Sequence, residues 1–250
     1  MTAPRRLVAA LACRAGGSRL YGKPLQMLDL ERNMSVLDHM IALLRTEPTI
    51  DEIVLGVAEG PENEPFHQAA RRLGIRSITG DETDVLSRLI QCGEAGGATD
   101  VFRTTTESPF TYFEAIEAGW ARHCREDNDV TNLAGVPDGS GFEMIKLSAL
   151  QRCHTNGDSR HRSELCTLYV REHRDEFRVD VLPIPPEVAR PELRLTIDYP
   201  EDLVICRRIA EHFRDVAPRI PLADILKFLD SRPDLLELVA PYCAPLTWYE

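Results

Sequence analysis

Short apolar runs with strand character alternate with amphipathic helical stretches along the first half of the chain. The expected strands are 6–12, 52–57, 75–78 and 100–104, and the expected helices are 36–44, 66–73 and 84–94. Strands joined by helices of about ten residues form βαβ units, whose strands lie parallel in one sheet. Right-handed crossovers place the helices on both faces. This order predicts an α/β fold with a Rossmann-like, mostly parallel sheet.

The second half of the chain is less regular. The Pro-Asp-Gly-Ser-Gly run at 137–141 predicts a turn between two short strands. The other expected elements are helices over 149–153 and 164–174, strands over 177–184 and 193–197, and helices over 200–212, 222–229 and 235–239. The sequence shows no internal repeat or low-complexity linker. We therefore expect one domain over residues 1–250, with an inserted arm at about 139–186.

The charge balance restricts the partners of the chain. Its 250 residues include 29 lysines and arginines against 40 aspartates and glutamates, which gives a formal net charge of −11. A clamp for duplex nucleic acid needs a surplus of cations, so we expect no nucleic-acid partner. A single nucleotide can still bind to a local basic loop.

Hydropathy and cysteine usage indicate the compartment. No apolar stretch approaches the roughly 20 residues that a membrane-spanning helix requires, so we expect no membrane partner. The seven cysteines are scattered and include no CxxC pair. This pattern disfavours a zinc site or a disulfide framework and favours reduced thiols in the cytoplasm.

The segment after the first expected strand, residues 12–25, is the most informative part of the sequence. It reads Ala-Cys-Arg-Ala-Gly-Gly-Ser-Arg-Leu-Tyr-Gly-Lys-Pro-Leu, with three glycines, three cations and a serine. Glycines let backbone N–H groups approach an anion, while arginine and lysine neutralise phosphate charge. A basic surface turn without a ligand is the alternative. We expect a triphosphate to bind to this segment, which we call the phosphate loop.

Two widespread nucleotide-binding motifs are excluded. Residues 17–23 match the G-x-x-x-x-G-K part of the P-loop, but the next position is Pro24. Proline lacks the hydroxyl group that ligates magnesium in a P-loop. The chain also lacks a G-x-G-x-x-G sequence after this strand, which excludes the dinucleotide fingerprint.

The phosphate loop resembles the A-x-R-x-G-S-x-R-L-P-G-K-x-L signature of cytidylyltransferases that activate sugars as CMP conjugates, especially the branch like the spore-coat polysaccharide cytidylyltransferases. Four further segments match this family in order. Residues 80–88 resemble G-x-x-x-D-V-L-x-R, 103–110 resemble R-x-T-x-D-x-P-L, 137–143 resemble P-D-G-x-x-x-E, and 194–202 resemble R-L-T-x-D-x-P-E-D. The resemblance covers almost the whole chain and implies a nucleotide-diphospho-sugar transferase fold of the GT-A-like kind.

The resemblance also implies an activity and a set of site residues. It implies Mg²⁺-dependent transfer of CMP from CTP to a sugar-like, phosphate or phosphonate acceptor, with release of pyrophosphate. The implied nucleotide-binding residues are Ala12, Arg14, Gly16, Gly17, Ser18, Arg19, Lys23, Gly80, Asp84 and Arg88. Arg14, Lys23 and Arg103 are the implied catalytic residues. The implied acceptor-binding residues are Asp138, Glu143 and Glu164, and the implied metal ligands are Glu107 and Asp198.

The residues taken alone leave structural roles open. Arg19 can form a salt bridge across its own loop, and Asp84 can pair with Arg88 four residues later on a helix surface. Glu107 can be a surface acid, and Asp198 can cap the following helix. Plain turn chemistry is likewise an alternative for the two polar residues at 138 and 143.

The chain departs from the family pattern at four positions. Gly17 stands where the family has serine, Tyr21 where it has proline, and Glu107 where it has aspartate. Leu165 replaces a histidine and cannot form a side-chain hydrogen bond, which bears on the acceptor more than on the nucleotide. Two alternatives therefore stay open: the same fold acting on GTP, UTP or ATP, and a nucleotide-binding protein that has lost catalysis.

The resemblance further implies a homodimer, because the arm between the Pro-Asp-Gly turn and the last strand commonly forms a two-fold interface in the family. The expected helix 164–174 carries Leu165, Leu168 and Tyr169, which together with Phe177 form a candidate apolar seam. Packing of these side chains inside the monomer is the alternative.

Overall fold

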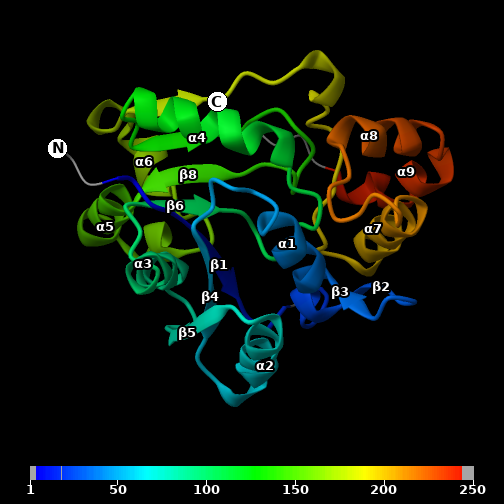
Figure 1. The fold of residues 1–250 in the computed structure, drawn as a ribbon, viewed down its shortest axis with the longest axis horizontal. Coiled ribbons are helices and arrows are strands. Elements are labelled where there is room, and N and C mark those ends of the chain that lie inside the picture. Colours follow the sequence, from blue (N-terminus) through cyan, green and yellow to red (C-terminus); the bar gives the residue numbers. More distant parts are fainter. Residues whose placement is uncertain (1–3, 18, 244–250) are drawn as a thin grey trace.

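A mostly parallel sheet forms the centre of the molecule (Figure 1). The computed structural model describes residues 4–17 and 19–243, and within them one sheet has seven strands in the order β5-β4-β1-β6-β8-β7-β9. Its strands are β1 (Leu7–Cys13), β4 (Glu52–Ala58), β5 (Arg76–Gly80), β6 (Asp100–Arg103), β7 (Val130–Asn132), β8 (Glu143–Lys146) and β9 (Val179–Val181). Only β8 runs antiparallel to its neighbours among these described strands. The predicted fold class is confirmed.

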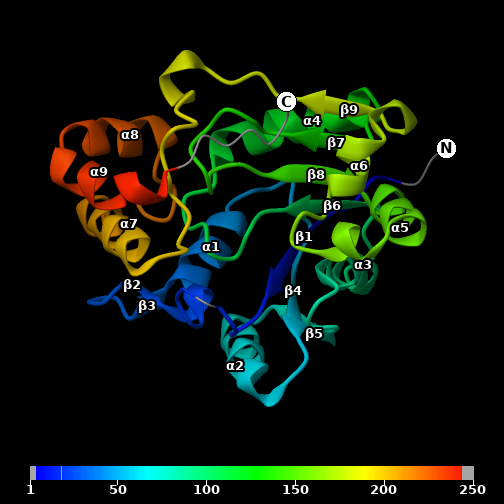
Figure 2. The ribbon, with the colours of Figure 1, turned by 180° about the vertical axis from the view of Figure 1, so that it is seen from behind.

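Helices cover both faces of the sheet, as the crossover rule predicts (Figures 1 and 2). They are α1 (Val36–Leu44), α2 (Glu64–Leu73), α3 (Val85–Ala95), α4 (Ile116–Arg125), α5 (Leu147–Asn156), α6 (Leu168–Glu172), α7 (Pro200–His212), α8 (Leu222–Asp230) and α9 (Pro233–Val239). Side chains alternate along β1, so that Leu7 and Leu11 pack with α1, α2 and α7 while Val8 and Ala10 pack with α3 and α5.

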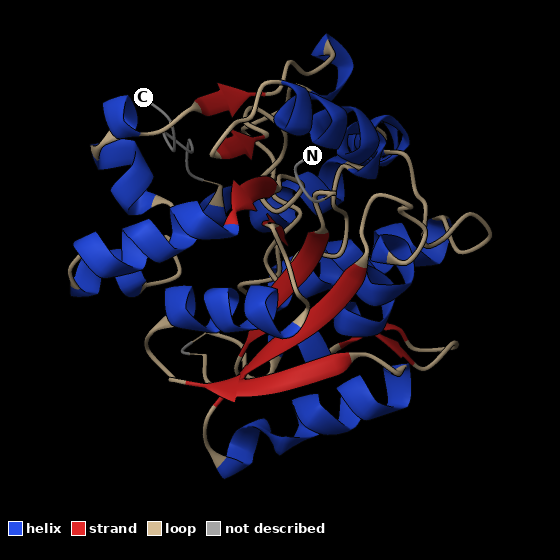
Figure 3. Ribbon diagram, turned by 60° about the vertical axis from the view of Figure 1, so that its left-hand side comes forward, coloured by secondary structure: helices blue, strands red, loops and turns tan. Residues whose placement is uncertain are grey.

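Local signals account for several element boundaries. Ser35 and Asp38 form a capping box that starts α1, with the Asp38 amide donating to the serine hydroxyl. Gly74 ends α2 in the left-handed conformation, with φ of 63°, as its place in the sequence predicts. A short hairpin, β2 (Met27–Asp29) with β3 (Met34–Ser35), follows the phosphate loop and contacts α7. Figure 3 shows the strands and the helices that surround them.

Three predicted elements are wrong in extent or kind. The expected strand over 177–184 is a strand only at β9. The expected helix over 164–174 is helical only at α6, and residues 163–167 form turns. The expected strand over 193–197 is extended but joins the sheet nowhere, since it makes one isolated bridge, from Arg194 to Asp138. Its amides donate to loop carbonyls instead: Leu195 to Asp138 at 2.7 Å and Ile197 to Glu107 at 3.0 Å. The segment therefore crosses the end of the sheet and brings distant loops together.

Residues 139–186 contribute strands to the main sheet as well as α5 and α6. β8 lies between β6 and β7, and β9 pairs in parallel with β7. Tyr169 and Phe177 are buried in the core formed with α3 and α5, which supports intramolecular packing for these two side chains. The homodimer stays a prediction.

The described helices are all too short or too polar to cross a membrane. All seven cysteines lie in the described part of the chain as free thiols.

Candidate active site

A cleft of about 1150 Å³ opens at the edge of the sheet where β1 and β6 end and β8 begins. Its walls come from the phosphate loop, the start of α3, the loop after β6, residues 133–143, the turns at 163–165 and the crossing segment at 191–198. Open α/β sheets place their ligands at this edge, because the loops after parallel strands converge there. A cleft of this size accommodates a nucleotide together with a second small molecule.

Most of the predicted site residues meet in this cleft. Its lining includes Ala12, Arg14, Gly16, Gly17, Arg19, Lys23, Arg88, Arg103, Glu107, Asp138, Glu143, Glu164 and Asp198. Gly80 and Asp84 do not line it, although Thr83 and Val85 on either side of Asp84 do. Ser18 lies outside the described residues.

The phosphate loop is held by hydrogen bonds from two directions. Gly22, in the left-handed conformation with φ of 57°, donates its amide to the Ala15 carbonyl at 2.9 Å. The Ala15 amide in turn donates to the side chain of Asn63 at 2.7 Å. A Cβ atom on Gly17 would lie 2.6 Å from the Leu20 carbonyl oxygen, so the close turn requires glycine there. No motif in the sequence indicates the buried Asn63, which acts from a 3-10 turn about fifty residues away.

Asp198 joins the phosphate loop to the crossing segment. Its carboxylate accepts hydrogen bonds from Lys23 Nζ at 2.6 Å and from Arg194 Nη2 at 2.7 Å, and Arg19 Nη1 lies 3.7 Å away. Burial favours the neutral acid, but Lys23 and Arg194 outweigh it and hold the pKa of Asp198 below its ordinary value. Asp198 does not cap α7, whose N-cap is Tyr199, so that alternative is wrong. The ion pair of Arg19 joins it to Asp198 and not to a residue of its own loop.

Arg194 and Asp202 complete this charge cluster, and sequence reasoning did not single them out. The buried Asp202 accepts from the backbone amides of Asp198 and Tyr199, both at 2.9 Å, and from Arg194. Arg194 also donates to Asp138 at 3.1 Å. The usable signal was the spacing of Arg194, Asp198 and Asp202 in steps of four, within the segment that resembles R-L-T-x-D-x-P-E-D.

Glu107 lies in the cleft wall rather than on the outer surface. Burial raises the pKa of Glu107, Asp198 raises it further, and Lys23 opposes both. A second carboxylate near Asp198 therefore carries a free-energy cost that a bound cation would relieve. Among the described residues, no group of three or more histidine, cysteine, aspartate or glutamate side chains is arranged so that it could hold a metal ion. Glu107 and Asp198 offer two carboxylates, which leaves the other coordination positions of a cation to water and phosphate oxygens. This donor set fits Mg²⁺, a hard cation that keeps several waters.

The other end of the cleft is built around Glu143, at the start of β8. Its carboxylate accepts from Arg103 at 2.6 Å and from Thr167 at 2.8 Å. Burial opposes ionisation, but the charge of Arg103 keeps the pKa of Glu143 below its ordinary value. Arg103 also donates to the Glu164 backbone carbonyl at 2.7 Å, and Leu165 forms part of the wall. This end combines ionised groups with an apolar side chain.

Arg88 forms part of the cleft floor. Its guanidinium is buried and donates to the backbone carbonyls of Cys13 at 2.9 Å and Gly56 at 3.2 Å, which ties β1 to β4. Asp84 instead accepts from His154 at 2.8 Å and caps α3 through the Ser87 amide. The alternative of an Asp84–Arg88 surface pair is therefore wrong.

Known proteins resemble this chain in sequence and in fold, although no protein-family model matches it. The spore coat polysaccharide biosynthesis protein SpsF of Bacillus subtilis is 25% identical over 228 residues, covering 90% of this chain and 94% of that protein. A cytidylyltransferase structure from Leptospira borgpetersenii has a TM-score of 0.84 at 17% identity, over 93% of this chain and 97% of that one. CMP:2-keto-3-deoxy-manno-octonic acid synthetase complexed with CTP has a TM-score of 0.64 at 15% identity, over 83% and 99%. The predicted resemblance is confirmed: the chain is similar in sequence to proteins of the cytidylyltransferase kind and shares the fold of solved cytidylyltransferases.

Proposed function

We propose that the chain transfers CMP from CTP to a hydroxyl, phosphate or phosphonate group of a small sugar-like acceptor and releases pyrophosphate. The observation that carries the proposal is the meeting of phosphate-binding cations and paired carboxylates at one end of the cleft, with Lys23 Nζ 2.6 Å from Asp198. The synthetase structure that contains CTP, and the names of the sequence relatives, support CTP as the nucleotide.

Nucleotidyl transfer asks the protein mainly to position the reactants and to neutralise developing negative charge. Arg14, Arg19 and Lys23 of the phosphate loop line the phosphate end of the cleft, together with Arg194. When the triphosphate enters, Lys23 exchanges its bond with Asp198 for phosphate oxygens. The carboxylate of Asp198 then becomes available to a cation, together with Glu107.

Glu107 and Asp198 are the residues that would hold Mg²⁺. The bound ion supplies charge neutralisation at the α-phosphate and at the leaving pyrophosphate. The acceptor occupies the cleft next to the triphosphate. Arg103 and Glu143 form a largely buried ion pair at the end away from the phosphate loop, and Asp138 lies beside Arg194, which links it to Asp198. Carboxylates in this setting orient hydroxyl groups by accepting their hydrogen bonds.

The proposal includes two further features of the enzyme. A homodimer is proposed from the resemblance of residues 139–186 to the family's dimer arm, and light scattering against the 28.1 kDa of one chain tests it. A cytoplasmic location is proposed from the seven free thiols, which suit a reducing compartment.

A pyrophosphate-release assay tests the proposed activity. The purified chain is incubated with Mg²⁺ and with CTP, UTP, GTP or ATP, against a panel of 2-keto sugar acids, sugar phosphates and phosphonates. Release with CTP and one acceptor class supports the proposal. Release only with another nucleotide would show that the chain uses that nucleotide in place of CTP. Tight nucleotide binding without release under any combination shows that the chain binds nucleotide and has lost catalysis.

A further inference from the structure

An arginine and two tyrosines stack beside the phosphate loop. Arg19 Cζ lies 4.9 Å from the ring centre of Tyr199, and the Tyr199 ring stacks on Tyr242 with centres 4.0 Å apart and planes at 17°. Arg19 lines the cleft, whereas neither tyrosine is part of its described wall. The two rings therefore reach the cleft through Arg19. We call Arg19, Tyr199 and Tyr242 the Arg–Tyr–Tyr stack.

The backbone beneath Tyr199 is fixed. The amides of Asp198 and Tyr199 both donate to one oxygen of Asp202, at 2.9 Å each, and the Asp202 side chain is 1% exposed. Pro200 follows directly and begins α7, which restrains the chain after Tyr199. The middle ring of the stack is thus attached to a rigid part of the protein.

The outer ring is fixed by the C-terminal helices. Tyr242 belongs to the 3-10 turn Ala240–Tyr242, which directly follows α9. α9 packs against α7, and Figure 2 shows the two helices side by side. A hydrogen bond between Tyr242 and Glu201, in the first turn of α7, adds a polar link, and burial followed by the nearby Glu201 charge raises the pKa of Tyr242. The C-terminal helices therefore support the ring that contacts Arg19.

Arg19 needs such support because its other tether is weak. Its side chain is 49% exposed, and its 3.7 Å approach to Asp198 is an ion pair too long for a hydrogen bond. An aromatic ring attracts a guanidinium through its face. A guanidinium held by its face keeps its N–H edge available for bidentate contact with phosphate oxygens. The ring contact therefore orients the arginine without occupying the donors that a triphosphate needs.

We propose that Tyr199, supported by Tyr242, is a positioning residue that holds Arg19 ready for the nucleotide triphosphate. This inference rests on the proposed function in one respect only, namely that a triphosphate is the ligand of Arg19. Ordering a long, exposed side chain before binding lowers the entropy that binding must remove. The stack is expected to act on affinity for the nucleotide more than on the chemical step.

Calorimetric titration with CTP and Mg²⁺, without an acceptor, measures this effect. We expect Tyr199→Leu to raise the Kd for CTP about three- to tenfold, the range of a cation–π contact. Tyr199→Phe keeps the ring and removes only the hydroxyl, so it is the matched control and should stay within about twofold of the wild type. In turnover assays, Tyr199→Leu should raise KM for CTP and change kcat less.

A double-mutant cycle separates action through Arg19 from a general structural effect. In an Arg19→Ala background, Tyr199→Leu should cause no further loss of CTP affinity. If Tyr199→Leu weakens binding by the same factor in both backgrounds, Tyr199 does not act through Arg19 and the proposal is overturned. Should Tyr199→Leu fail to fold, Tyr242→Leu replaces it in the cycle, with the same direction and a smaller change expected.

Side-chain NMR of Arg19 in nucleotide-free protein gives a readout that does not depend on ligand. Ring currents from Tyr199 should shift the Arg19 side-chain protons, and the shift should persist in Tyr199→Phe and vanish in Tyr199→Leu. A wild type that shows the shift but binds no nucleotide refutes the proposed function and leaves the stack intact. A wild type that binds CTP while Tyr199→Leu retains both its Kd and the shift refutes the positioning role.

Discussion

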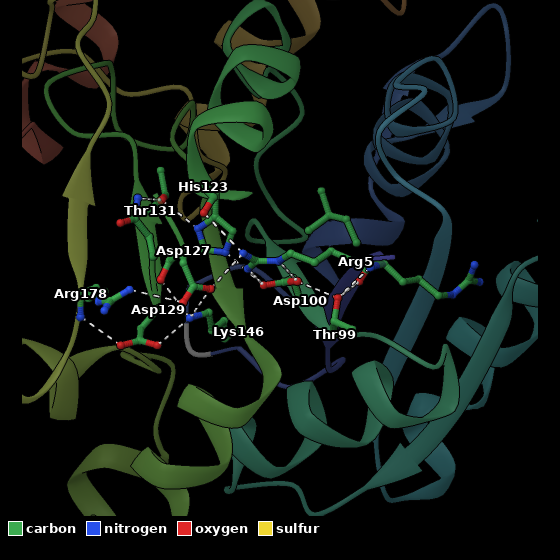
Figure 4. A network of polar contacts seen from close by, with 12 residues as sticks. Arg5, Thr99, Asp100, His123, Asp127, Asp129, Thr131, Lys146 and Arg178 are labelled. Atoms are coloured by element: carbon green, nitrogen blue, oxygen red, sulfur yellow. Dashed lines mark hydrogen bonds and ion pairs between the residues drawn. The ribbon is translucent and has the colours of Figure 1, made fainter. Parts of the chain in front are cut away.

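One aspartate with cationic partners lies at each end of the sheet: Asp100 is buried and Asp198 is half-buried. The two aspartates differ in what surrounds them. At the end opposite the cleft, Asp100 of β6 bonds to Arg5, His123 and Thr99 (Figure 4). Its side chain is 1% exposed, and it receives Arg5 Nε at 2.9 Å, His123 Nε2 at 3.1 Å and Thr99 Oγ1 at 2.7 Å. All three partners are structural residues that hold the folded chain together.

Asp198, at the cleft end, has partners that under the proposed function also bind the nucleotide. Its side chain is 22% exposed, and Lys23 and Arg194 satisfy it in the absence of nucleotide. Lys23 belongs to the phosphate loop, so under the proposed function a bound triphosphate would compete with Asp198 for it. The neighbouring Glu107 is left with a raised pKa, caused first by burial and then by Asp198. Under the proposed function, the saturated network of Asp100 stabilises the fold, whereas the partners of Asp198 are exchanged when a ligand binds.

The largest effect is expected for a substitution of Asp100, whose network at the end opposite the cleft is saturated. Asp100→Asn removes the buried carboxylate charge that His123 and Arg5 face and leaves Arg5, among the described residues, only its longer ion pair with the exposed Asp127; removing one partner of a buried ion pair costs about 3–5 kcal/mol. Urea unfolding should show this loss in the free energy of unfolding. Turnover per folded molecule, measured well below the melting temperature, should stay at the wild-type value.

The exposed pair of Arg232 with Asp234 provides the matched control for this substitution. Asp234→Asn removes the same charge from a solvent-exposed site and should change stability far less. Equal effects of Asp100→Asn and Asp234→Asn would show that burial of the network contributes nothing.

Asp198→Asn should have the opposite profile. The amide keeps the shape of the side chain but removes the charge that serves Lys23 and Arg194 and would serve the metal. We expect kcat/KM for Mg²⁺-dependent pyrophosphate release to fall about 100- to 1000-fold, the loss typical of a group that stabilises charge in the transition state. Binding of CTP should partly survive through Arg14 and Lys23. Normal turnover of this variant would remove Asp198 from the catalytic site.

Lys23→Ala should have the next largest effect. It removes a charge-assisted contact worth about 1.5–3 kcal/mol, which corresponds to a ten- to hundredfold loss of CTP affinity or turnover. Lys227 on α8 is the matched control, because its exposed ammonium pairs only with Asp224, three residues away, among the ion pairs of the described residues. Unchanged kinetics of Lys23→Ala with an intact fold would show that this loop does not bind the triphosphate.

The sequence predicted the elements whose boundaries are set locally. The bounds of α1 and α7 agree with the prediction because a capping serine and Pro200 mark their first turns. The segment 193–197 was misassigned because an extended stretch looks alike whether or not it joins a sheet. Its partners, the carbonyls of Glu107 and Asp138, are fixed by the tertiary fold.

The residues of the candidate site likewise fall into two groups: those that the local sequence indicates and those that only the tertiary fold brings there. The phosphate loop and Asp198 stand out in the sequence because glycines, cations and acids recur there in short, ordered segments. Asn63 contacts the loop, and Tyr242 contacts Tyr199 beside it, from distant parts of the chain, and nothing in their immediate sequence indicates either contact. Arg88 was expected near the nucleotide, but its burial beneath β1 and β4 follows from the packing of α3.

Acid should weaken the saturated end in a defined pH window. Burial alone would raise the pKa of Asp100, but hydrogen bonds from Arg5, His123 and Thr99 lower it from 3.8 to about 2. The unfolded chain therefore binds this proton first, and the stability is lost as pH falls from about 4 to about 2. The free energy of unfolding falls by about 2 kcal/mol over this window. Urea unfolding across this window should show a steeper fall for the wild type than for Asp100→Asn; parallel curves would contradict the assignment.

Glu107→Asp should have the smallest effect, and it tests whether the second carboxylate of the cleft is a ligand. Aspartate restores the residue of the family pattern and retracts the carboxylate by one methylene, so activity should stay within about threefold of the wild type or rise. Glu107→Gln keeps the length and removes the charge, and should lower Mg²⁺-dependent turnover at least about tenfold because a neutral amide binds the hard cation poorly. Titration with Mn²⁺ in the presence of CTP should show weaker metal binding for Glu107→Gln alone. If Glu107→Gln matches the wild type in turnover and in metal affinity, Glu107 is a wall residue whose raised pKa reflects burial beside Asp198.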